Sequence, residues 1–86
     1  MSKEEAKVYE QTAELYSIDG AVCCAICGSA YSIEMHHIRY GACGRKTYMG
    51  NVIPLCSKHH KLVHTNKKTF QPVLIDMINK KLEAVE

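Results

Sequence analysis

Two pairs of potential metal ligands, each separated by two residues, are the strongest chemical signal in the sequence. The first pair is Cys24 and Cys27, and the second is Cys56 and His59. A tetrahedral zinc ion often takes two ligands from each of two tight turns, and three thiolates with one imidazole form an ordinary structural set. Gly28 follows the first pair and lets the backbone turn behind the second thiolate. We therefore predict a structural Zn²⁺ at these four side chains.

The remaining cysteines leave alternatives open. Cys23 could compete with Cys24, although three residues would then separate it from Cys27, and Cys43 has no assigned role. A redox role for the Cys-x-x-Cys pair is the main alternative, but no βαβ pattern surrounds it. The odd number of cysteines and a polar first segment without a leader sequence favour a reducing compartment. We expect a cytoplasmic protein with no membrane-spanning segment.

A second group of residues has the composition of a catalytic metal site. Its members are His36, His37, Asn51, His60 and His64. Residues four apart on a helix share a face, so His60 and His64 can bind one ion together. Neighbours on a strand point to opposite faces, so only one of His36 and His37 easily joins them. The other histidine is then a candidate general base, since imidazole titrates near pH 6.5 (about one unit either way). The alternative is a set of scattered surface histidines.

Positive charge is concentrated in residues 39–68, which contain no Asp or Glu. The basic residues of this segment are Arg39, Arg45, Lys46, Lys58, Lys61, Lys67 and Lys68. Residues 1–20, in contrast, carry five acids against two lysines. An acid-free basic segment suits a surface that faces a polyanion, although a merely solvated face is the alternative. Arg39, Arg45 and Lys46 are the candidate nucleic-acid contacts, because guanidinium groups fit phosphate oxygens.

Two helices are expected to flank these residues, at about 3–17 and about 70–84. In the first, apolar residues recur at three- and four-residue steps, and Asp19 with Gly20 ends it. In the second, Thr69 is at the cap position and Pro72 in the first turn, where proline is tolerated.

Shorter elements are expected between the two helices. Residues 31–38 alternate as in a strand, and residues 39–50 form a glycine-punctuated loop. Val52 and Ile53 predict a brief second strand that Pro54 ends, and a helix capped by Ser57 should run to about residue 65. The 86 residues make one small domain whose core needs support from a metal.

The segment 24–64 resembles the HNH endonucleases with their zinc knuckle. The likeness is strongest to the phage-type recombination-enhancement (RecA-dependent) nucleases, through His-His-Ile-Arg at 36–39 and Pro-Leu-Cys-x-x-His-His at 54–60. The resemblance implies an α+β, small ββα-metal fold with a zinc knuckle of three cysteines and one histidine. The N- and C-terminal helices would flank this core motif in a single domain, 1–86.

The resemblance also implies a role for each residue of the second group. His37 would be the general base and His36 a metal ligand, while His60 and His64 would complete the catalytic metal site. Asn51 would orient His37 or approach the metal. The activity implied is metal-dependent hydrolysis of DNA, leaving 5′-phosphate and 3′-hydroxyl ends, with a recombination or phage-replication protein as a further partner.

The sequence departs from the family pattern at two positions. His36 stands where many members have Asp, so the catalytic ion can be Mg²⁺, Mn²⁺, Ni²⁺ or Zn²⁺, with imidazole favouring the last three. His59 replaces one cysteine of an all-cysteine structural site. A non-catalytic zinc module that binds nucleic acid or protein is the alternative function, and an accessory subunit of a larger complex is a third.

Overall fold

An antiparallel pair of five-residue strands, β3 (Ile33–His37) and β6 (Val52–Cys56), forms the centre of the fold. Their register sets Met35 opposite Pro54 and His37 opposite Val52. The computed structural model of the chain describes residues 2–41 and 44–84. Within them there are three helices and three two-stranded antiparallel sheets, which makes the fold class α+β.

Ser2 caps the N-terminus of helix α1 (Lys3–Leu15). The Ser2 hydroxyl accepts a hydrogen bond from the Glu5 backbone N–H and donates one to the Glu5 carboxylate. After the helix, β1 (Ser17–Ile18) and β2 (Ala21–Val22) form a tight hairpin. Asp19 and Gly20 both have positive φ at its turn, as an Asp-Gly hairpin requires. The helix therefore ends two residues before the predicted position.

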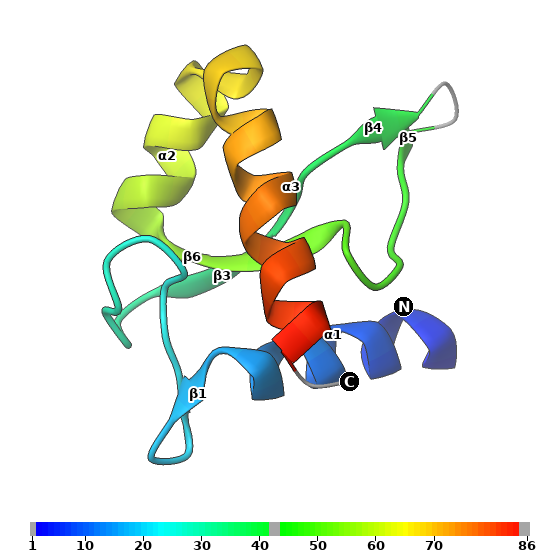
Figure 1. Cartoon of the computed structure of the whole chain (residues 1–86), viewed down its shortest axis with the longest axis vertical. Coiled ribbons are helices and arrows are strands. Elements are labelled where there is room, and N and C mark those ends of the chain that lie inside the picture. The colour runs from blue at the N-terminus through cyan, green and yellow to red at the C-terminus, as the bar shows by residue number, and fades with distance from the viewer. Residues whose placement is uncertain (1, 42–43, 85–86) are drawn as a thin grey trace.

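Helices α2 (Ser57–Thr65) and α3 (Lys67–Ala84) follow β6 directly. Figure 1 shows α2 on one side of the β3–β6 pair and α1 on the other. Helix α3 runs past the strand pair from α2 towards α1. Leu74 and Ile78 of α3 are fully buried in one cluster with Ile53 and Leu55 of β6 and Val63 of α2. All five residues of β6 are buried, because helices cover both of its faces.

Several sequence predictions need correction here. Pro54 does not end the second strand, which continues to Cys56; in a two-stranded sheet the missing N–H of proline can face away from the partner. Ser57 does not cap α2, because Cys56 takes that position and makes no side-chain cap bond. The last helix begins at Lys67 rather than near residue 70, so Pro72 lies inside it.

The segment between the central strands contains the third sheet, a short hairpin of β4 (Tyr40–Gly41) and β5 (Gly44–Arg45). The sequence predicted this region only as a loop. In Figure 1 the hairpin extends away from the three helices. No helix in residues 2–41 and 44–84 has the length and apolar character needed to cross a bilayer.

Candidate metal centres

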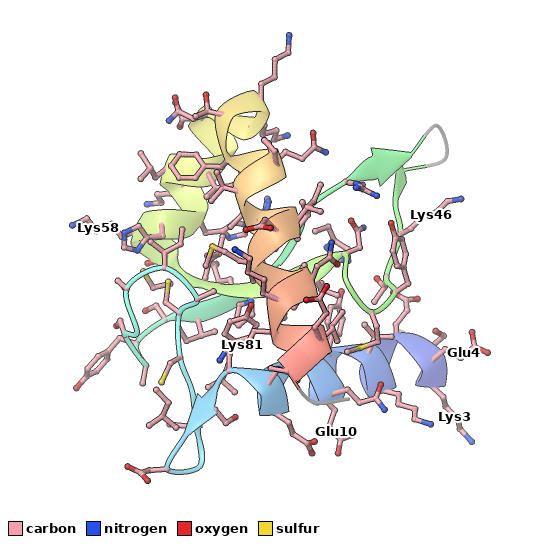
Figure 2. The ribbon with its side chains drawn as sticks, in the orientation of Figure 1. Lys3, Glu4, Glu10, Lys46, Lys58 and Lys81 are labelled. Atoms are coloured by element: carbon pink, nitrogen blue, oxygen red, sulfur yellow. The ribbon has the colours of Figure 1, made fainter. Side chains whose placement is uncertain are left out.

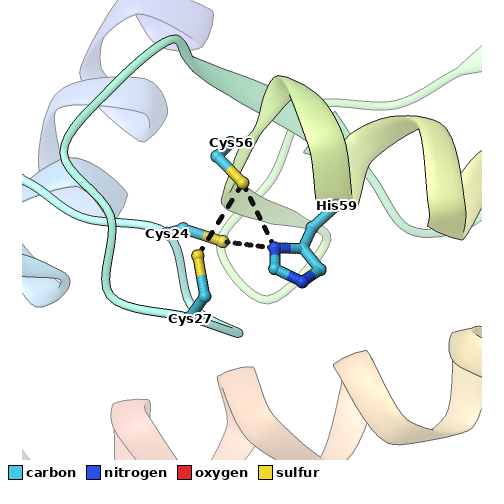
Figure 3. A group of neighbouring side chains, drawn as sticks. All are labelled: Cys24, Cys27, Cys56 and His59. Atoms are coloured by element: carbon cyan, nitrogen blue, oxygen red, sulfur yellow. Dashed lines mark hydrogen bonds between the residues drawn. The ribbon is translucent and has the colours of Figure 1, made fainter.

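Cys24, Cys27, Cys56 and His59 come together at one point, although the two pairs are far apart in the sequence (Figure 3). Nδ1 of His59 lies 3.2 Å from the sulfur of Cys56 and 3.8 Å from that of Cys24, and the Cys27 and Cys56 sulfurs are 3.8 Å apart. In tetrahedral zinc sites, ligand atoms lie about 3.8 Å (S to S) and about 3.6 Å (S to N) apart. The structure therefore brings the four predicted ligands together in a cluster whose geometry is compatible with a zinc ion.

The backbone explains why the two pairs meet. Gly28, with φ of 77°, turns the first pair back so that its N–H donates to the carbonyl of Cys24 at 2.9 Å. The N–H of Ala25 donates to the carbonyl of Pro54 at 2.9 Å, which fastens this turn to β6. Cys56 ends β6 and His59 lies in the first turn of α2, three residues later, so both face the same point.

The electrostatics of the cluster also suit a cation. Burial alone would raise the pKa of the Cys24 thiol, but backbone N–H groups of Cys27, Cys56 and Ile26 outweigh it and lower this pKa to about 6. The backbone at Ser29 lowers the pKa of Cys27, yet desolvation and the neighbouring Cys24 and Cys56 sulfurs outweigh that effect and raise it. The repulsion between thiolates this close together is offset when a dication lies between them.

The sequence contains two further cysteines, Cys23 and Cys43. Cys23 is buried outside the cluster, and its thiol lies 3.5 Å from the carbonyl of Ala21. It does not take the place of Cys24, the alternative that the spacing left open. Cys43 lies outside the described residues.

A second cluster consists of His36, His60 and His64, whose candidate ligand atoms lie within 4.8 Å of one another. The ring of His36 is 5.2 Å from that of His60 and 5.5 Å from that of His64, and the latter two are 4.8 Å apart, centroid to centroid. His36 comes from β3, whereas the other two lie one helical turn apart on α2. The predicted grouping of His36 with the helical pair is confirmed as a geometric fact.

The environment of His36 suits a metal ligand. Its side chain is buried, and its Nδ1 has no hydrogen-bond partner within residues 2–41 and 44–84. Burial, followed by the charges of His60 and His64, lowers the pKa of His36 to about 4, so the imidazole stays neutral near pH 7. Unpartnered buried nitrogen is costly in a folded protein. A divalent ion shared by the three histidines would remove that cost if it took Nδ1 of His36 as its ligand atom, and such donors fit Zn²⁺, Ni²⁺ or Mn²⁺.

His37 lies on the opposite face of β3, as strand geometry predicts. Its Nε2 is 2.9 Å from the Thr47 hydroxyl and 3.2 Å from the Tyr9 hydroxyl of α1. The Thr47 hydroxyl also lies 3.5 Å from the Glu5 carboxylate, to which it can donate. Hydroxyl groups donate or accept, so these contacts suit either tautomer of the imidazole. His37 is therefore held by residues that are distinct from the histidine cluster.

Asn51 is buried, and its side chain bonds to the backbone on both sides of the β4–β5 hairpin; its implied role toward His37 or the metal stays a prediction. Its Oδ1 accepts from the Arg39 N–H at 2.9 Å, and its Nδ2 donates to the carbonyls of Arg39 and Lys46, at 3.2 and 2.7 Å. Both amide protons are thus used by the two ends of the β4–β5 hairpin, rather than by His37 or the histidine cluster. Asn51 therefore ties together the two ends of this hairpin.

The basic segment is continuous in sequence but divided in space. Lys46 and Lys58 project from opposite sides of the molecule (Figure 2). Arg39 and Lys46 are exposed at the base of the β4–β5 hairpin, and Arg45 belongs to β5. The remaining bases lie on α2 and at the start of α3. The predicted nucleic-acid contacts therefore share the hairpin, which is close to His37 through Thr47.

Three residues near the histidines were missed by sequence reasoning. Glu34 lies 2.9 Å from Nδ1 of His60, and the alternation of β3, which puts residues 34 and 36 on one face, could have identified it. Tyr9 and Thr47 contact His37 from distant segments. No local pattern marks them, because their positions depend on how α1 and the hairpin pack.

No protein-family model, curated protein or solved structure matches the chain.

Proposed function

We propose that this chain is a metal-dependent endonuclease of the HNH (ββα-metal) type that hydrolyses phosphodiester bonds in DNA. The observation that carries the proposal is the division of two adjacent histidines. His36 joins His60 and His64, while His37 turns to the other face of β3, beside the basic hairpin. β3 and α2 supply these groups, and β6 lies between them in the chain, which is the strand–strand–helix order of a ββα-metal unit.

Each part of the geometry supports one role in hydrolysis. A divalent ion held by His36, His60 and His64 would supply Lewis-acid stabilisation of charge on the phosphate and the leaving oxygen. His37 takes a proton from the attacking water, a task that suits an imidazole near neutral pH. Asn51 holds the hairpin that carries Arg39 and Lys46, and these residues bind phosphate oxygens. The cysteine cluster fixes the end of β6 and the start of α2.

The arrangement around His37 places a condition on this mechanism. Nε2 is the nitrogen that accepts the proton in our proposal, and the Tyr9 hydroxyl lies 3.2 Å from it. The Thr47 hydroxyl lies closer, at 2.9 Å, so water has to replace both hydroxyls before it can bind this nitrogen. Replacing Tyr9 with Phe removes one of the two contacts. It should therefore not slow single-turnover cleavage, and a rise of up to about fivefold is expected, because one hydrogen bond contributes roughly 1 kcal/mol.

Tyr31→Phe provides the matched control for Tyr9→Phe. It removes the same hydroxyl from a side chain that is 85% exposed, and it should leave the rate unchanged. A tenfold fall in the rate of Tyr9→Phe alone would show that the Tyr9 hydroxyl takes part in the reaction, contrary to the condition above.

The hairpin should dominate DNA affinity through its charge. Changing Arg39, Arg45 and Lys46 together to Ala should weaken binding and reduce the slope of log K against log salt by up to about three, since each phosphate contact contributes about 0.9. The measurement is DNA binding across a series of salt concentrations with a fluorescent duplex.

A triple variant of equal charge tests where the DNA lies. Lys58, Lys61 and Lys68 are exposed on α2 and α3, and their change to Ala should alter the slope much less. If the α2 and α3 variant flattens the slope as strongly as the hairpin variant, the hairpin is not the principal DNA contact.

The alternative function, a zinc module that binds DNA or protein without catalysis, uses the cysteine cluster and the basic residues alone. It gives no role to the burial of His36 against the helical pair. A buried imidazole nitrogen without a hydrogen-bond partner lowers folding stability, and a binding module has no use for such a group. This difference favours the catalytic proposal.

A further inference from the structure

Glu34 forms a polar contact with the histidine cluster. Its Oε1 lies 2.9 Å from Nδ1 of His60, across the gap between β3 and α2. Glu34 and His36 are two residues apart on β3, so both face α2. One strand thus presents a histidine of the cluster and, beside it, a carboxylate that contacts a second histidine of the cluster.

This contact determines which nitrogen of His60 is available. A carboxylate accepts hydrogen bonds only, so Nδ1 of His60 must carry the proton that Glu34 accepts. In the neutral imidazole the lone pair is then on Nε2, the nitrogen that can coordinate a metal. Hydrogen bonds of this kind fix the tautomer and the ring orientation of metal-binding histidines and raise their basicity.

The exposure of Glu34 argues against a mainly structural role. Its side chain is 53% exposed and that of His60 is 21% exposed. Exposed ion pairs contribute little to folding stability, because water and salt screen them. The same bond has a larger effect on metal binding, since it selects the ligand atom.

We propose that Glu34 is a positioning residue of the histidine site: it holds His60 with its proton on Nδ1 and directs Nε2 at the bound divalent ion. The proposal rests on the metal site of the proposed function. It goes beyond that site by adding a carboxylate on β3 that tunes metal affinity without coordinating the ion.

The first test is a metal titration of zinc-loaded protein with Co²⁺, followed by calorimetry and by the visible absorption of the bound ion. Glu34→Ala should weaken Co²⁺ binding by about 10- to 100-fold. Glu34→Gln keeps an acceptor oxygen and should recover part of this loss. The absorption bands of saturated variants should match those of the parent, because the coordinating atoms are unchanged.

Asp76→Ala is the matched control. Asp76 forms an ion pair with Lys80, at 3.0 Å, on α3, and its side chain is 63% exposed, close to the 53% of Glu34. Its loss should leave Co²⁺ affinity unchanged. An equal loss in this variant would mean that general surface charge, rather than the contact with His60, sets the affinity, and would overturn the proposal.

The second test reads the tautomer directly. Nitrogen-15 NMR of the zinc-loaded protein, before Co²⁺ is added, should show His60 protonated on Nδ1 in the parent and a mixture of tautomers in Glu34→Ala. This readout separates the two hypotheses. If the parent binds no Co²⁺, the metal site and the role of Glu34 toward it are both wrong. If the parent binds Co²⁺ but Glu34→Ala changes neither affinity nor tautomer, only the role of Glu34 is wrong. A changed absorption spectrum in Glu34→Ala would make Glu34 a direct ligand and would also overturn the positioning role.

Discussion

Replacing Cys56 with Ser should release zinc from the protein and unfold it near room temperature or little above. Cys56 joins both ligand pairs, because its sulfur lies 3.8 Å from that of Cys27 and 3.2 Å from Nδ1 of His59. Structural zinc supplies roughly 10–16 kcal/mol of binding free energy, which is as large as the stability of a small domain. Losing such a metal costs more than about 4 kcal/mol, equivalent to a fall in Tm of at least about 16 °C in a chain of this size.

Cys23→Ser separates this effect from the loss of a buried thiol. Cys23 is 8% exposed and Cys56 is 7% exposed, but Cys23 lies outside the cluster. The control should keep one zinc per chain and most of its stability, as measured by atomic absorption and thermal unfolding. If Cys56→Ser keeps its zinc and parental Tm, the cluster is not the zinc site. If Cys23→Ser loses the zinc instead, Cys23 replaces Cys24 as a ligand.

Ligand spacing and strand alternation are the parts of the site that the sequence predicts well. Two-residue gaps identify Cys24, Cys27, Cys56 and His59, because zinc coordination imposes that spacing on the chain. The opposite directions of His36 and His37 follow from the pleat of any strand. Both inferences depend on local geometry, which packing elsewhere does not alter.

The parts that sequence reasoning missed depend on packing or on backbone partners. The Asn51 amide donates hydrogen bonds to the backbone carbonyls of Arg39 and Lys46. A pattern of side-chain types in the sequence does not indicate such backbone partners. Tyr9 reaches His37 from a helix 28 residues earlier. Pro54 was expected to end a strand, but its place in a two-stranded sheet makes its missing N–H harmless.

Replacing His37 with Ala should slow cleavage by about 10²- to 10⁴-fold, the usual contribution of a general base. Both metal sites should stay filled, because His37 belongs to neither cluster. His36→Ala or His64→Ala should instead lower the divalent-ion content as well as the rate. His37→Gln is the matched variant: it retains a polar side chain for Tyr9 and Thr47 but has no basic nitrogen, so it should be as slow as His37→Ala.

Single-turnover cleavage of supercoiled plasmid by zinc-loaded protein tests the central claim most directly. The parent, His37→Ala and His37→Gln are compared with Mg²⁺, Mn²⁺, Ni²⁺ and added Zn²⁺, and metal content is measured on the same samples. We expect cleavage by the parent with at least one ion, and rates at least about 10²-fold lower in both variants with unchanged metal content. Cleavage by His37→Ala at the parental rate, or no cleavage by the parent with any of these ions, would contradict the nuclease proposal and leave the zinc-binding module in its place.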